Sequence, residues 1–228
     1  MYTTVLFDLD HMLLDSDESE RLAFAATMAG AGASDVADEL FPTYTAINRA
    51  MWAAVERGEL TPLDVKARRF EDFVTQTGLD ADPTAMAVAF VHGLGAHGDL
   101  YPGARELLSA VRPHARTALV TNGIGEVQRA RIARLGLAPF FDAISISGEL
   151  GVAKPAPEIF DHTFAELSVG DRNQAVMIGD SLTSDIAGGS NAGIDTIWFN
   201  RHGSVAGAVT PTHEVRAIDE IAAVLGVS

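Results

Sequence analysis

Beyond Pro102, short apolar segments alternate with stretches of helical spacing, and this alternation constrains the fold more than any other feature of the sequence. The apolar segments are 117–120, 143–146, 175–178 and 196–199, with a last one near 214–217. Helical patterns lie between them, near 103–111, 124–135, 157–167 and 183–192. Strands that alternate with helices in this way predict an α/β fold, in which helices cover both faces of a parallel sheet.

The N-terminal part of the chain adds one more strand and a long helical insertion. Residues 3–9 read as a short buried strand that ends in carboxylates. From about 16 to 98, apolar residues recur instead at helical spacing, as in Ile47, Met51 and Val55. We therefore predict a core domain made of residues 1–15 and 99–228, with a helical domain of residues 16–98 inserted after the first strand.

Polar residues follow three of the predicted strands at the point where each strand ends. Asp8 and Asp10 come after the first strand, the run 121–123 (Thr-Asn-Gly) after the second, and the run 179–181 (Gly-Asp-Ser) after a third. In open α/β sheets, ligands bind just beyond the carboxyl ends of the strands. We therefore expect these polar groups to converge on one crevice.

Four aspartates give that crevice the character of a metal site. Asp8 and Asp10 stand two residues apart, and Asp180 and Asp185 follow a later strand. Carboxylates this close raise one another's pKa unless a cation lies between them. Each aspartate alone could equally cap a helix or form a turn. Four of them at strand ends, in a chain without cysteine, favour Mg²⁺, which prefers oxygen ligands.

Further residues could hold phosphate. Lys154 lies between glycine and proline residues, ahead of a helix predicted to begin near Pro157. Lysines usually lie in solvent, but the flanking residues indicate a fixed loop. Thr121, Asn122 and Gly123 bring a hydroxyl and backbone N–H groups to a helix start, where phosphate oxygens can bind, although an ordinary N-cap would look the same.

Together these groups fit phosphoryl transfer. Asp8 would attack phosphorus to form an acyl phosphate, and Mg²⁺ would reduce repulsion between the two anions. Lys154, Thr121 and backbone amides would stabilise the developing charge. Asp10 would protonate the leaving oxygen and then deprotonate the water that hydrolyses the intermediate.

Composition narrows the class of partner. The net charge of −15, from 31 acidic and 16 basic residues, opposes binding to nucleic acid and to anionic lipid. The sequence contains no apolar run of membrane-spanning length and no signal-peptide pattern at its start. We expect a cytoplasmic enzyme, a monomer or homodimer, whose partner is a small-molecule phosphate ester.

The ordered motifs resemble those of the haloacid dehalogenase (HAD) superfamily, in its phosphatase majority. The matching segments are 8–10 (Asp-Leu-Asp), 121–123, the Lys154–Pro155 loop and 179–185, and the resemblance covers essentially the whole chain. It implies a Rossmann-like core with a mobile helical cap. It also implies a nucleophile at Asp8, an acid/base at Asp10, and Mg²⁺ held by Asp8, the Asp10 carbonyl and Asp180 with support from Asp185.

A narrower resemblance points to the pyrimidine 5′-nucleotidase branch, which acts on nucleoside 5′-monophosphates. It rests on segments 7–13, 47–58, 69–70 and 188–200. Trp52 and Phe70 of the insertion could stack on a base, but their helical spacing favours the core of the cap. Met12 replaces the usual threonine of the nucleophile loop, and Leu14 replaces an aromatic residue common in this branch.

Other functions fit the same motifs. Asp10 argues against a dehalogenase, and the position of Lys66, far along the insertion, argues against a phosphonate-cleaving enzyme. A sugar-phosphate or phosphoglycolate phosphatase or a phosphomutase would share the core residues. A catalytically silent phosphate-binding protein is the alternative outside enzymes, and retention of every charged candidate position argues against it.

Overall fold

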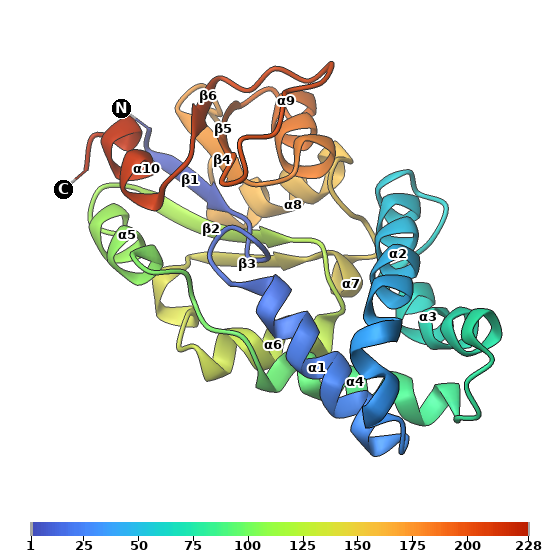
Figure 1. The fold of residues 1–228 in the computed structure, drawn as a ribbon. Helices are drawn as coiled ribbons and strands as arrows, with labels where there is room; N and C mark the ends of the chain where they lie inside the picture. The colour runs from blue at the N-terminus through green and yellow to red at the C-terminus, as the bar shows by residue number, and fades with distance from the viewer. Residues whose placement is uncertain (1, 228) are drawn as a thin grey trace.

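A computed structural model describes residues 2–227, and its centre is a sheet of six parallel strands (Figure 1). The strands are β1 (Thr4–Phe7), β2 (Arg116–Thr121), β3 (Ala143–Ile146), β4 (Ala175–Gly179), β5 (Asp195–Phe199) and β6 (His213–Val215). Their order across the sheet is β3-β2-β1-β4-β5-β6. The predicted α/β fold with a parallel sheet is confirmed. The last strand begins one residue earlier than predicted and ends at Val215.

Both faces of the sheet are buried, as the alternation of side chains along β1 shows. Val5 and Phe7 pack into one hydrophobic cluster together with α5 (Ala104–Val111) and α10 (Ile218–Leu225). Leu6 points to the opposite face and packs into a second cluster with α8 (Pro157–Leu167). A strand that is buried on both sides reads as a continuous apolar run, and this is why the predicted strands stand out in the sequence.

Residues 16–98 are helical. They form α1 (Ser16–Gly30), a 3₁₀ turn (Ser34–Val36), α2 (Ala37–Glu56), α3 (Pro62–Thr77) and α4 (Pro83–Ala96). The starts are set by side chains: Asp15 and Asp82 accept backbone N–H groups of α1 and α4, and Thr61 forms a capping box with Asp64. Figure 1 shows this helical region beside the end of the sheet where β1 ends.

An aromatic cluster holds the helical region together. Phe24, Tyr44, Phe70, Phe73 and Phe90 are fully or almost fully buried and contact one another, with ring centroids about 5–6 Å apart. Aromatic pairs at such distances contribute about 0.5–1.5 kcal/mol each beyond the burial of area. The helical region therefore has a hydrophobic core separate from the two clusters on the sheet.

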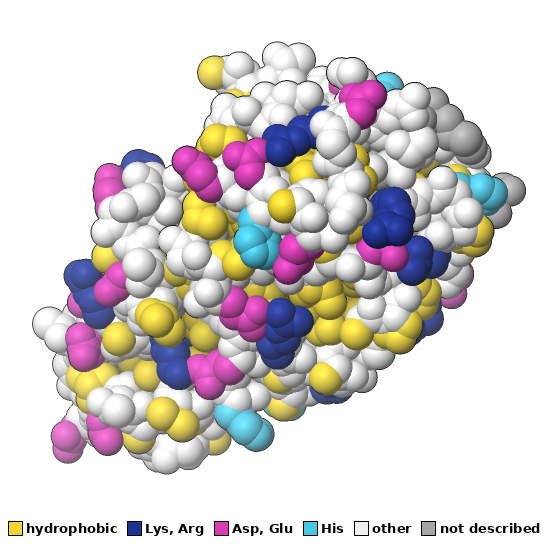
Figure 2. Space-filling model, turned by 180° about the vertical axis from the view of Figure 1, so that it is seen from behind, with side chains coloured by type: hydrophobic (Ala, Val, Ile, Leu, Met, Phe, Trp, Pro, Cys, Tyr) yellow, Lys and Arg dark blue, Asp and Glu magenta, His cyan; other side chains and the backbone are white. Residues whose placement is uncertain are grey.

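Shorter helices follow the remaining strands. They are α6 (Gly125–Arg134), the 3₁₀ turn Ala138–Phe140, α7 (Ser147–Leu150), a π-helical turn (Leu182–Ile186) and α9 (Ala187–Asn191). The helix predicted over 183–192 is thus two elements, and α7 was not predicted. Within residues 2–227, no helix combines the length and the hydropathy needed to cross a membrane. On the face seen in Figure 2, the basic side chains lie singly or in small groups next to acidic ones.

Candidate active site

A buried lysine joins two carboxylates at the carboxyl end of β1. Asp8 directly follows β1, and its Oδ1 accepts a hydrogen bond of 2.6 Å from the Nζ of Lys154. The same Nζ donates to Oδ1 of Asp185, also at 2.6 Å. All three side chains are buried, and Lys154 is only 1% exposed. The sheet therefore brings together residues that are 146 positions apart in the sequence.

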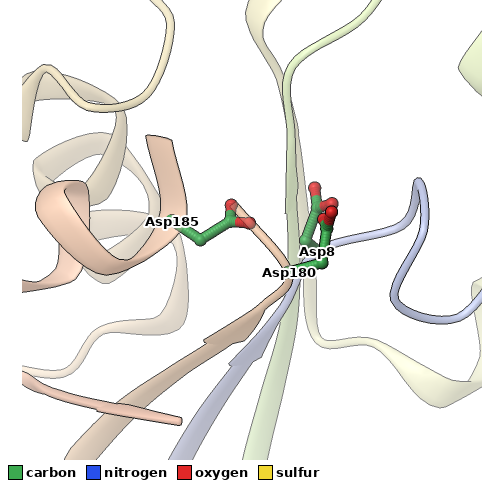
Figure 3. A group of neighbouring side chains, drawn as sticks. All are labelled: Asp8, Asp180 and Asp185. Carbon is green, nitrogen blue, oxygen red and sulfur yellow. The ribbon is translucent and has the colours of Figure 1, made fainter. Parts of the chain in front are cut away.

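Asp180 completes a group of three carboxylates with Asp8 and Asp185. One oxygen atom of each lies within 4.8 Å of the others, and Figure 3 shows the Asp8 and Asp180 side chains next to each other, with Asp185 reaching toward them. Both oxygens of Asp185 already accept hydrogen bonds, from Lys154 and from the backbone N–H of Ser181. The donor set fits Mg²⁺, with Asp8 and Asp180 as the carboxylates better placed to bind it.

Gly179 makes room for Asp185. A Cβ atom at position 179 would lie 2.2 Å from Cγ of Asp185, a distance no side chain tolerates. The last residue of β4 must therefore lack a side chain for the Asp185 carboxylate to reach Lys154. Trp198 of β5 fixes the following residue, because its Nε1 donates a hydrogen bond of 2.8 Å to the carbonyl of Asp180.

The pKa values of these groups reflect burial and crowding of charge. Burial raises the pKa of Asp8 well above its ordinary value, although Lys154 opposes this. Burial and the nearby Asp185 raise the pKa of Asp180 to about 8. Burial alone would lower the pKa of Lys154, but Asp185 and Asp8 together raise it, so the ammonium stays charged. A further cation would relieve the repulsion among the carboxylates.

Asp10 faces a different set of partners from Asp8. Its carboxylate accepts hydrogen bonds from Ser16 Oγ (2.6 Å), Gln128 Nε2 (2.6 Å) and Arg131 Nη1 (2.7 Å). Burial alone would raise the pKa of Asp10, but Arg131, assisted by these hydrogen bonds, lowers it. Sequence reasoning missed Gln128 and Arg131. Their spacing of three on a helix that starts just after the polar strand end at 121–123 is the signal that could have found them.

The residues of the run 121–123, which were predicted together with Lys154 to bind phosphate, have different surroundings. The Thr121 hydroxyl is fully buried and accepts a hydrogen bond of 2.8 Å from Gln128. Asn122 is paired with the backbone of Lys154, donating to its carbonyl at 2.9 Å and accepting from its N–H at 2.8 Å. Asn122 and Gly123 border the cavity described next. Asn122 thus holds the lysine loop against the second strand end, and phosphate binding by these residues stays a prediction.

A cavity of about 530 Å³ opens above these carboxylates. The helical region contributes Glu20, Asn48, Trp52 and Arg69 to its wall, and the core contributes Asp8 and Lys154. Trp52 is partly buried and lines the cavity, whereas Phe70 lies wholly in the aromatic cluster. Met12 is fully buried in the core of the sheet. A volume of this size is typical of small-molecule sites.

Comparison with known proteins agrees with the fold. Residues 2–193 match the haloacid dehalogenase-like hydrolase family. The pyrimidine 5′-nucleotidase YjjG of Escherichia coli is 36% identical over 80% of this chain and 81% of its own length. The pyrimidine 5′-nucleotidase PynA of Streptococcus pneumoniae is 34% identical over 88% and 85%. A magnesium-bound crystal structure of the HAD-hydrolase YfnB from Bacillus subtilis superposes with a TM-score of 0.89 at 32% identity, covering 98% of both chains.

The chain belongs to the haloacid dehalogenase-like hydrolase family, because the family match spans most of its length. It is an enzyme, a hydrolase built on the parallel sheet described above. Within that family it is a phosphatase. The predicted resemblance to the pyrimidine 5′-nucleotidase branch is confirmed by its similarity to two such enzymes.

Proposed function

We propose that the protein is a magnesium-dependent phosphomonoester hydrolase that forms an aspartyl-phosphate on Asp8 and acts on nucleoside 5′-monophosphates. The observation that carries this proposal is the buried arrangement of Asp8, Lys154 and Asp185, with Asp180 beside it, at the floor of a cavity large enough for a nucleotide. These four residues come from three separate parts of the sequence, and a shared site is the reason for their convergence.

In the first step, an oxygen of Asp8 attacks phosphorus while the bond from phosphorus to the leaving oxygen breaks. Asp10 gives its proton to that oxygen, so the leaving group departs as an alcohol. Lys154 lies 2.6 Å from Asp8 and holds the nucleophile in place, and its positive charge stabilises the negative charge that accumulates on the phosphoryl oxygens. Asn122 positions Lys154 through its two backbone hydrogen bonds.

In the second step, water attacks phosphorus and the bond to Asp8 breaks. Asp10 removes the proton from that water, which returns both carboxyl groups to their starting states and releases inorganic phosphate. Arg131 donates a hydrogen bond to Asp10 and lowers its pKa, which stabilises the ionised Asp10 that the first step leaves behind and that acts as the base here. When bound by Asp8 and Asp180, with the Asp10 carbonyl as a further ligand and Asp185 in support, Mg²⁺ would neutralise charge between nucleophile and phosphate.

The similarity to two pyrimidine 5′-nucleotidases supports a nucleoside 5′-monophosphate as the substrate. The cavity lining supports it too, because side chains of residues 16–98 border the same cavity as the nucleophile. The leaving group would therefore contact the helical region while the phosphate contacts the core. Closure of that region would exclude water from the phosphoryl transfer.

The test combines trapping of the intermediate with a matched aspartate control. Asp8→Asn should lower turnover of cytidine 5′-monophosphate by more than about a hundredfold, since loss of a covalent nucleophile costs several decades. Acid quenching with substrate labelled in the phosphate should give labelled protein for the wild type and none for Asp8→Asn. The control is Asp99→Asn, because the Asp99 side chain is 95% exposed.

Three results would contradict the proposal. Label retained by the Asp8→Asn protein would move the nucleophile elsewhere. Isomerised phosphate ester, in place of free phosphate, would show a mutase. Chelation of Mg²⁺ should abolish turnover, and full activity after chelation would remove the metal from the mechanism.

A further inference from the structure

Arg69 is a buried cation in the cavity wall that the phosphoryl-transfer steps do not use. It lies on α3, is 1% exposed, and its guanidinium stacks on the ring of Phe90 at 4.4 Å. Its Nη1 donates to Asn48 Oδ1 at 3.1 Å and weakly to the Tyr44 hydroxyl at 3.4 Å. Burying a charge is costly unless its hydrogen bonds are satisfied, so the remaining N–H groups of Arg69 are informative.

The Nε and Nη2 atoms of Arg69 have no hydrogen-bond partner among residues 2–227. These two atoms form one edge of the guanidinium. In two other arginines of this chain, the corresponding edge donates to both oxygens of one carboxylate at 2.7–2.9 Å. These pairs are Arg21 with Glu18 and Arg129 with Glu149. Arg69 borders the cavity, but both atoms of this unfilled paired donor edge are themselves buried, so a neighbouring side chain must move before a ligand reaches them. A ligand with two adjacent acceptors would satisfy it.

The surroundings of Arg69 indicate which acceptors fit. Asn48 bridges Arg69 to Glu20, because its Oδ1 accepts from Arg69 and its Nδ2 donates to Glu20 Oε1 at 2.6 Å. Glu20 also lines the cavity, and carboxylates outnumber basic side chains around it. These carboxylates would repel a second anionic group on the leaving group. An uncharged ring fits better if its edge carries acceptors for Arg69 next to an N–H donor for Glu20.

We propose that Arg69 determines the specificity of the enzyme by donating its Nε–H and Nη2–H to the carbonyl oxygen and the adjacent unprotonated ring nitrogen of cytosine in the leaving group. This inference rests on the proposed nucleotide phosphatase activity and deepens it. The phosphate binds at Asp8 and Lys154, and the base binds at Arg69. Arg69 thus acts on the choice of leaving group and not on the phosphoryl transfer itself.

The experiment compares three arginine variants on three phosphate esters. Arg69→Met keeps the apolar stem and removes the donor edge, and Arg68→Met is the control because Arg68 is the exposed neighbour on the same helix. For Arg69→Met we expect kcat/KM for cytidine 5′-monophosphate to fall about 10- to 100-fold, the range for hydrogen bonds to a charged group. Turnover of phenyl phosphate, whose ring carries no acceptor, should change less than about threefold. Arg68→Met should match the wild type on both.

Two further measurements, turnover of phosphoglycolate and the activity of Arg69→Lys, separate the remaining interpretations of the role of Arg69. Lysine keeps the charge but lacks the paired edge, so Arg69→Lys should remain impaired on cytidine 5′-monophosphate, and recovery of wild-type kcat/KM would overturn the proposal. A larger Arg69→Met loss on phosphoglycolate than on the nucleotide would reassign Arg69 to a carboxylate. Equal losses on all three esters, with an unchanged melting temperature, would refute a role in specificity while leaving the phosphatase intact. A wild type that hydrolyses none of the esters would refute the proposed function and this inference together.

Discussion

The two lysines of the chain allow one substitution to be compared in opposite surroundings. Lys154 is 1% exposed and lies 2.6 Å from both Asp8 and Asp185. Lys66 pairs with Glu126, but their side chains are 33% and 54% exposed. We predict that Lys154→Met lowers the free energy of unfolding by about 3–5 kcal/mol at pH 7 without metal, because it leaves buried carboxylates without their counter-charge. Lys66→Met should cost about 0–1 kcal/mol.

Urea denaturation followed by circular dichroism measures both changes. The Lys154→Met penalty should shrink as the pH falls, because burial already raises the pKa of Asp8, and protonation of that carboxyl removes the unpaired charge. Adding Asp8→Asn to Lys154→Met should cost less than the sum of the single variants, since the two residues share one interaction. A penalty below about 1 kcal/mol at pH 7, or one independent of pH, would refute a lysine held between buried carboxylates.

Three further predictions concern the metal site, the acid/base and the glycine beside it. In metal-free buffer, raising the pH from about 4 to about 8 should lower the free energy of unfolding. The pKa of Asp180 is raised to about 8, so in this window the folded state keeps a proton that the unfolded state loses. In urea denaturation, Mg²⁺ should make the free energy of unfolding depend less on pH. Asp10→Asn should slow turnover about 10²- to 10⁴-fold yet leave Mg²⁺ binding intact by calorimetry, and loss of binding would place its side chain on the metal. Gly179→Ala should lower kcat at least about tenfold, because the new methyl would lie 2.2 Å from Asp185 Cγ, whereas Gly170→Ala, with nothing within 4 Å, should not.

The sheet was predictable because its strands are buried on both faces. Such strands appear in the sequence as short apolar runs, and the residues that follow them must meet at one edge. Asp8 and Asp180, which directly follow β1 and β4, were therefore predictable as neighbours, whereas Lys154 follows α7 and was predicted from its loop and from the family motifs. The helix predicted over 183–192 begins instead as a π-helical turn from Leu182 to Ile186, a distinction of hydrogen-bond register that residue types do not encode.

The residues that sequence patterns did not reveal are those whose role depends on where their side chains point in the folded protein. Arg131 reads as an ordinary helical arginine, yet it reaches Asp10 through Nη1 and the Leu94 carbonyl through Nε. Arg69 and Phe70 are adjacent in sequence, but one lines the cavity and the other fills the aromatic cluster. Helical spacing shows that a face is buried and does not tell which part of it borders a cavity.

The buried cations show where this acidic chain concentrates its positive charge. Among residues 2–227, the buried basic side chains are Arg69, Arg131 and Lys154, and all three line the same cavity. Lys154 contacts two carboxylates, Arg131 contacts one, and Arg69 forms no ion pair with the described residues. Replacing a buried ion pair with apolar residues often stabilises a protein, so stability alone does not explain three such cations around one cavity. In the proposed mechanism, Lys154 offsets the repulsion between the anionic phosphate and the carboxylates of the site, while Arg131 acts on Asp10 and Arg69 on the leaving group.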